Sequence, residues 1–125
     1  MDAMGKLLYG TSGIEIEFDD RTLTHLQIVV AAKLRRKESF FFSWKDDPAV
    51  GDGRSSIWLD SSIPLYFKFA GGRVPSINRE WLDILTASSN GSGGLQFTDE
   101  PTGQNGGSGN GSNGHGGSAG PATVR

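Results

Sequence analysis

The chain has 125 residues, enough for one domain, and its formal net charge of −2 gives no overall attraction to nucleic acid. It contains no cysteine, which excludes a disulfide framework and a thiolate metal site. Its longest apolar runs fall well short of the ~20 residues that a membrane span needs, and its start lacks the apolar stretch of a signal peptide. We therefore expect a cytoplasmic protein with no membrane association.

Composition divides the chain near Phe97. Residues 1–97 hold nearly all of the large apolar side chains and are predicted to form one small α+β domain. Residues 98–125 are mainly Gly, Ser and Asn, and they cannot bury enough apolar surface to offset the entropy lost on ordering. We expect this segment to be a disordered tail.

The first predicted elements are two strands. Residues 6–9 are a short strand candidate, and residues 10–13, which read GTSG, have the composition of a turn. In residues 14–18 apolar and acidic side chains alternate, as they do in a half-buried strand. The two segments predict an opening β-hairpin.

A helix is predicted for residues 21–37. Asp19 and Asp20 precede this segment and can cap its N-terminus. At helical spacing its mainly apolar stripe consists of Leu23, Leu26, Gln27, Val30 and Leu34. His25 falls on the opposite side of the helix, so we expect its side chain to face solvent.

Three strands are predicted next, at residues 39–45, 54–59 and 63–69. Residues 46–53, between the first two, contain Asp, Gly and Pro and are typical of a polar loop. Residues 60–62 suit a tight connection between the second and third strands. We expect an antiparallel meander with one buried face.

A second helix begins at Ser76 or Asn78, runs to about Ser88 and ends at the Asn-Gly pair of residues 90–91. Residues 95–97 are a candidate for a short final strand. The element order ββαβββα, with this optional strand, predicts an antiparallel or mixed sheet with two helices on one face.

No group of side chains predicts catalysis. His25 is expected at the surface and His115 lies in the tail, so neither belongs to a specific set of nucleophile, base and acid. The acidic loop at residues 46–53 lacks the alternating oxygen ligands of a calcium loop, and residues 10–13 lack the spacing of a phosphate-binding loop. We expect no metal site and no cofactor.

The outer face of the predicted meander combines aromatic and cationic side chains, provided that the helices cover its other face. Arg54 and Trp58 belong to this outer face in one of two possible registers. The candidate binding residues are Phe41, Lys45, Arg54, Trp58, Tyr66 and Lys68. Such a face can stack bases and contact phosphates, or it can bury against a protein partner or a second copy of the chain.

Three stretches of the chain carry a family resemblance. The first reads GKLLYGTSGIEIEFDDRTLTHLQIVVAAKLRR, the central one reads SFFFSWKDDP and, after a gap, GDGRSSIWL, and the third reads IPLYFKFAGGR and, after a gap, INREWLDIL. Over residues 4–97 the chain resembles a family of short actinobacterial proteins with a domain of unknown function. Members of that family often carry the label ATP-dependent DNA ligase, so the resemblance implies a connection with DNA metabolism.

The residues do not support ligase chemistry. Adenylation by a DNA ligase uses a lysine in a K-x-D-G setting, whereas the nearest string here, at residues 45–48, reads KDDP and lacks the glycine. We therefore expect a small non-catalytic interaction module that binds a protein partner or itself. The alternative is an accessory nucleic-acid-binding protein in DNA metabolism.

Overall fold

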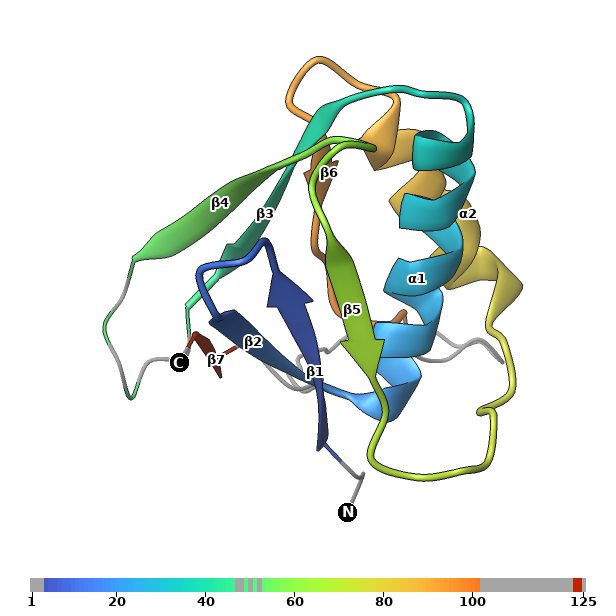
Figure 1. Cartoon of the computed structure of the whole chain (residues 1–125). Helices are drawn as coiled ribbons and strands as arrows, with labels where there is room; N and C mark the ends of the chain where they lie inside the picture. The colour runs from blue at the N-terminus through green and yellow to red at the C-terminus, as the bar shows by residue number, and fades with distance from the viewer. Residues whose placement is uncertain (1–3, 47–48, 50, 52, 102–122, 125) are drawn as a thin grey trace.

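The computed structural model of the chain describes residues 4–46, 49, 51, 53–101 and 123–124 (Figure 1). Its elements are β1 (Met4–Tyr9), β2 (Ile14–Asp19), α1 (Asp20–Arg35), β3 (Phe40–Lys45), β4 (Arg54–Leu59), β5 (Leu65–Lys68), α2 (Arg79–Ser89), β6 (Leu95–Gln96) and β7 (Thr123–Val124). The predicted α+β class, the order ββαβββα and the short final strand near residue 95 are confirmed.

The strands form two sheets. One has the order β5-β1-β2-β7, and the other has the order β4-β3-β6. The predicted disordered tail lies outside the described residues at 102–122 and 125, while Thr123 and Val124 pair with Glu17 and Ile16 of β2.

The predicted three-stranded meander is wrong, because its third strand belongs to the other sheet. β3 and β4 pair in antiparallel fashion as expected, but β5 pairs with β1. The backbone N–H of Gly10 donates to the carbonyl of Pro64 at 2.9 Å and holds the start of β5 beside the β1–β2 turn. Alternation of side chains identifies the buried face of a strand but not the strand with which it pairs. Strands that are consecutive in sequence usually pair, so β4 was the predicted partner of β5.

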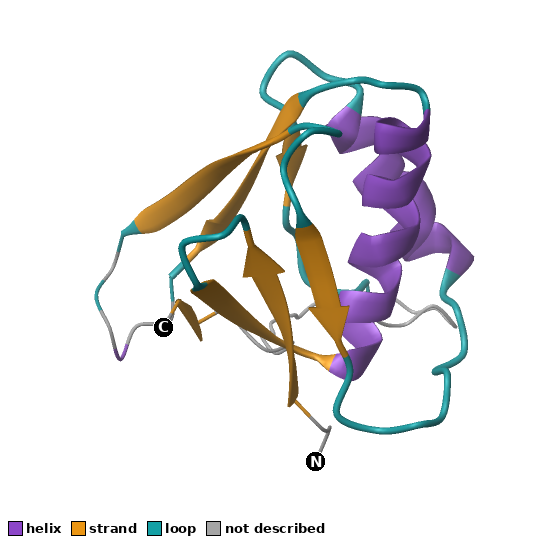
Figure 2. Ribbon diagram, in the orientation of Figure 1, coloured by secondary structure: helices purple, strands orange, loops and turns teal. Residues whose placement is uncertain are grey.

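The two helices lie side by side on one side of the sheets (Figure 2). Asp19 caps α1, since its carboxylate accepts from the backbone N–H and the hydroxyl of Thr22 at 3.1 and 2.7 Å. Asn78 caps α2 by accepting from the backbone N–H of Trp81 at 3.2 Å. Within the described residues, neither helix is long and apolar enough to cross a membrane.

The core lies between the helices and the two sheets. It consists of Leu7, Ile16, Phe18, Leu23, Leu26, Val29, Val30, Phe40, Phe42, Trp44, Leu59, Trp81, Leu85 and Leu95. Phe40, Phe42 and Trp44 are alternate residues of β3, so this strand turns one whole face inward. The other face of β3 is left for solvent.

Candidate interaction surface

The outward side chains of β3 and β4 form three directly opposed pairs. Phe41 lies opposite Trp58, Ser43 opposite Ser56, and Lys45 opposite Arg54. We call these six residues the β3–β4 outer face. Phe41 is 50% exposed and Trp58 is 45% exposed, although both are large and apolar.

Each of the three pairs has a different chemistry. The rings of Phe41 and Trp58 meet edge to face, with centroids 5.0 Å apart and an interplanar angle of 70°. The hydroxyl oxygens of Ser43 and Ser56 are hydrogen-bonded at 2.8 Å. Lys45 and Arg54 are exposed, and neither has an ion pair with any residue that the structure describes. An apolar end and a cationic end are thus separated by four residues, or about 14 Å of strand.

A shallow pocket of about 360 Å³ opens at the cationic end of this face. Its lining consists of Ser43, Trp44, Lys45, Arg54, Ser55, Ser56, Gln96 and Phe97. The indole Nε1 of Trp44 is buried and has no hydrogen-bond partner among the described residues. The lining therefore combines two exposed cations with neutral polar side chains and contains no acidic residue.

The free edge of β4 is less open than its face. β4 has β3 on one side, and no described strand pairs with its other side. The hydroxyl of Tyr9 in β1 donates to the backbone carbonyl of Trp58 and occupies one end of this edge. Blocking an edge in this way hinders the addition of another strand. Binding by side chains on the face is therefore easier than strand addition at the edge.

The structure brings four of the six predicted site residues together and separates the other two. Phe41, Lys45, Arg54 and Trp58 lie on the β3–β4 outer face. Tyr66 and Lys68 lie on β5, opposite Leu8 and Lys6 of β1 in the other sheet.

The prediction that all six residues share one face is wrong for the same reason as the predicted meander, because β5 pairs with β1 and not with β4. Tyr66 is 58% exposed, and Lys68 lines a second shallow pocket together with Lys6 and Glu15. Lys6 is paired with Glu15 at 3.3 Å, so the charge of Lys6 is balanced locally.

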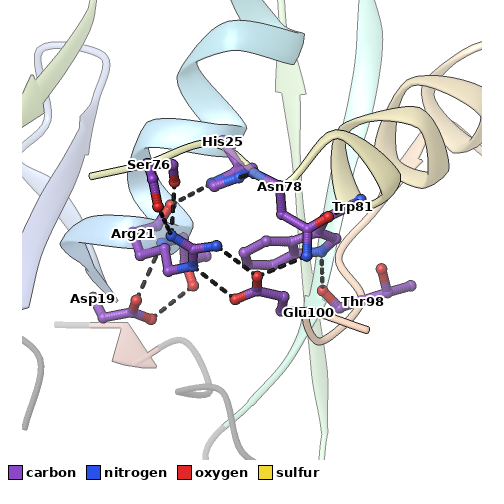
Figure 3. Close-up of polar contacts among 9 residues, drawn as sticks. Asp19, Arg21, His25, Ser76, Asn78, Trp81, Thr98 and Glu100 are labelled. Carbon is purple, nitrogen blue, oxygen red and sulfur yellow. Dashed lines mark hydrogen bonds and ion pairs between the residues drawn. The ribbon is translucent and has the colours of Figure 1, made fainter. Parts of the chain in front are cut away.

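His25 is fully buried, which contradicts its predicted exposure to solvent. Its Nδ1 lies 2.7 Å from the carbonyl oxygen of Arg21, and its Nε2 accepts from the backbone N–H of Asn78 at 2.9 Å (Figure 3). A backbone N–H only donates, so the proton of the neutral ring is on Nδ1. The ring packs against Trp81 of α2 with centroids 4.7 Å apart. The prediction considered burial against the sheets alone, whereas α2 covers a second side of α1.

A polar cluster surrounds His25 and joins three segments of the chain (Figure 3). Arg21 donates to both carboxylate oxygens of Glu100, at 2.8 and 2.7 Å, and to the carbonyl of Ser76 at 2.7 Å. The side chain of Asn78 donates to the same carboxylate at 2.8 Å. The hydrogen bond from Arg21 is the largest cause that holds the pKa of Glu100 below its ordinary value.

This cluster has a structural role, since each of its polar groups is engaged by another. Sequence reasoning missed it because Glu100 lies in the segment assigned to the tail. The bidentate contact with Arg21 and a hydrogen bond from the indole of Trp81 to the carbonyl of Thr98 tie residues 98–100 to the helices. Among the residues that the structure describes, no three His, Cys, Asp or Glu side chains form a group that could hold a metal ion.

A family model described as a domain of unknown function, DUF7882, matches residues 4–100. The chain belongs to the DUF7882 family. Comparison with curated proteins and with solved structures finds no match. The DUF7882 match runs from the first residue of β1 to Glu100, the partner of Arg21, and so includes the whole polar cluster. The predicted resemblance to a domain of unknown function is confirmed at this level.

Proposed function

We propose that the DUF7882 domain is a small non-catalytic interaction module that binds a protein partner, or a second copy of itself, through the β3–β4 outer face. The observation that carries this proposal is the exposed Phe41–Trp58 pair on a face whose other side is fixed in the core. Aromatic residues and arginine dominate the binding energy of protein interfaces, and Arg54 lies on the same face.

The aromatic pair supplies enough apolar surface to matter in binding. Phe and Trp side chains each bury about 150–250 Å² when covered, and about half of each is exposed here. Covering the exposed halves contributes roughly 4–6 kcal/mol before the costs of association are subtracted. Because Phe42 and Trp44 fix β3 from its inner side, little side-chain or backbone order has to be gained on binding.

The burial and hydrogen bonding of His25 support a role without catalysis. Its two ring nitrogens are both used within the fold, and the ring is fully buried. A general acid or base needs a nitrogen within reach of a substrate.

Nucleic acid is the second candidate, and the pair of cations beside two aromatic rings is the observation that favours it. An accessory role in DNA metabolism, as the family resemblance implies, would follow from it. A single-stranded nucleic acid is usually held by a run of cations along its backbone. Lys68 lies on the other sheet, and Asp46 follows Lys45 directly, so the cationic part of the face is short. A protein partner is therefore the better fit.

Site-specific crosslinking tests the proposal. A photoreactive benzoylphenylalanine is placed at Trp58 in the full chain and, as a control, at Val74, which is even more exposed but lies outside the β3–β4 outer face. We expect a discrete protein adduct in cells with the probe at position 58 and none with it at position 74. An adduct of twice the chain mass would identify a second copy as the partner.

Two results would contradict the proposal. One is the same pattern of products at positions 58 and 74, together with a monomer at all concentrations in sedimentation. The other is a salt-sensitive anisotropy shift with single-stranded DNA that disappears in Lys45→Glu, without any protein adduct at position 58. The second result would establish the nucleic-acid function.

A further inference from the structure

We infer that the cationic end of the β3–β4 outer face is a carboxylate subsite. It would take an acidic side chain from an extended segment of the protein partner, while an apolar side chain of the same segment covers Phe41 and Trp58. This inference rests on the proposed function and specifies the chemistry of the partner.

The first support is that Lys45 and Arg54 have no ion pair with any residue that the structure describes. The two cations are directly opposed across the strands, an arrangement that disfavours the sheet unless an anion lies between them. Elsewhere the chain supplies such anions: Glu38 binds both Lys33 and Arg36, and Glu100 binds Arg21. Asp46 does not serve Lys45 in this way, because its carboxylate accepts from the hydroxyl of Ser55 at 2.8 Å, on the inward side of the hairpin.

The second support is the set of donors around the pocket at this end. Besides the two cations, Ser43, Ser56 and Gln96 line the same space. The hydroxyls of Ser43 and Ser56 are hydrogen-bonded to each other, which leaves one of their two O–H groups for a ligand. Arginine binds carboxylates with two parallel hydrogen bonds, so Arg54 is suited to hold such a group in one orientation.

The third support is the distribution of charge along the face, which favours one carboxylate over a chain of phosphates. Beyond the aromatic pair, Ser39 directly precedes β3 and Asp60 directly follows β4, and their side chains are hydrogen-bonded. Hydrogen bonds from Ser39 and Ser62 lower the pKa of Asp60 to about 2, so this end of the hairpin carries a negative charge. A polyanion lying along the face would meet that charge, whereas a peptide with one acidic residue at the other end would not.

The spacing of the two ends predicts the sequence of the partner segment. The aromatic pair and the cationic pair are four residues apart on both strands. In an extended peptide, residues i, i+2 and i+4 point to the same side. A peptide that lies along the hairpin should therefore carry its apolar and acidic residues four positions apart.

A spacing scan tests this. Capped peptides of Ser and Thr, each with one Phe and one Asp separated by two to six positions, are titrated into the full chain, and binding is measured by calorimetry, whose signal does not depend on Trp58. We expect the tightest binding at a separation of four. Replacing the Asp by Asn should weaken that peptide at least about tenfold, as should the double variant Lys45→Gln/Arg54→Gln.

The control removes the same two charges elsewhere. The variant Arg73→Gln/Arg79→Gln changes two exposed cations outside the face and should leave the affinity unchanged. Affinity that is independent of spacing, equal binding of the Asn peptide, or no binding of any Asp peptide overturns the subsite. If Phe41→Thr/Trp58→Thr abolishes binding while Lys45→Gln/Arg54→Gln does not, the subsite is wrong and the proposed function stands. If neither double variant changes binding, both are wrong.

Discussion

Lys37 shows how one residue ends α1 at a cost in backbone strain. Its φ of 61° lies in the left-handed region, and its N–H donates to the carbonyl of Leu34 at 2.9 Å. The N–H of Glu38 donates to the carbonyl of Lys33 at 3.2 Å, which completes a Schellman motif. Glycine usually occupies this position because it lacks the Cβ that makes the conformation costly.

We therefore expect Lys37→Gly to raise the free energy of unfolding by roughly 0.5–1 kcal/mol, since relief of the strain outweighs the added entropy of the unfolded chain. Urea denaturation measures the change. The comparison is Arg36→Gly, at a φ of −88°, which should destabilise the fold. A loss of stability in Lys37→Gly as large as that in Arg36→Gly would show that Lys37 is not strained.

Glu100 makes stability depend on pH. Its pKa is lowered from 4.5 in the folded chain, mainly by the hydrogen bond from Arg21, so its contribution is fully present above pH 4.5. That contribution is lost as the pH falls through the lowered pKa. Glu100→Gln should cost stability at neutral pH and make the acid-side loss shallower than in the unchanged chain, as measured by urea denaturation at a series of pH values. Parallel pH profiles for the two proteins would contradict the assigned role.

His25 marks the limit of sequence reasoning at this scale. The apolar members Leu23, Leu26 and Val30 of the α1 stripe and the capping role of Asp19 could be predicted from local spacing, whereas Gln27, which was placed in the same stripe, is exposed. The burial of His25 could not, because its partners are the N–H of Asn78 and the ring of Trp81, which lie more than 50 residues away. When a second helix packs on the polar side of α1 through polar and aromatic groups, the sequence of α1 has the same pattern as a helix whose polar side faces solvent.

Among the elements, β6 depends on a glycine that precedes it. Gly94 has a φ of +79°, and a Cβ added there would lie 2.5 Å from the carbonyl oxygen of Phe41. This close approach lets β6 pair in parallel with β3 at Phe42 and Ser43.

Gly94→Ala should therefore lower the free energy of unfolding by roughly 2–4 kcal/mol, because it combines a strained φ with a clash against backbone. Thermal and urea denaturation give the value. Gly72→Ala, at a position with open space around it, is the control and should leave stability nearly unchanged. Equal stability of the two variants would contradict the close approach of Gly94 to the backbone of Phe41.

The strands show which part of the topology local pattern determines. Their positions and buried faces follow from alternation. The observed register of β3 and β4 is the one, of the two possible, that places Phe41, Lys45, Arg54 and Trp58 on the same face. The partner of β5 was set by contacts with β1 and with the β1–β2 turn, which alternation does not encode. Because β5 pairs with β1, Tyr66 and Lys68 lie in the other sheet and not on the predicted site.

At the scale of the whole molecule, α1 and α2 lie on one side and the β3–β4 hairpin lies on the other (Figure 1). The exposed rings of Phe41 and Trp58 point away from the core. The fold thus fixes the inner side chains of β3 and leaves the outer ones free to bind. Of the three tryptophans, Trp44 and Trp81 are buried in the core and Trp58 is exposed. The exposed one lies on the surface that we assign to a partner.

The most direct test of this assignment is the affinity of the full chain for the protein that crosslinks at position 58, measured by calorimetry. Phe41→Thr/Trp58→Thr should weaken binding at least about tenfold, with no loss of the folded state by circular dichroism. Met4→Thr/Val74→Thr removes two other exposed apolar side chains and should bind like the unchanged chain. Equal affinities for all three proteins would contradict the claim that the β3–β4 outer face is the interaction surface.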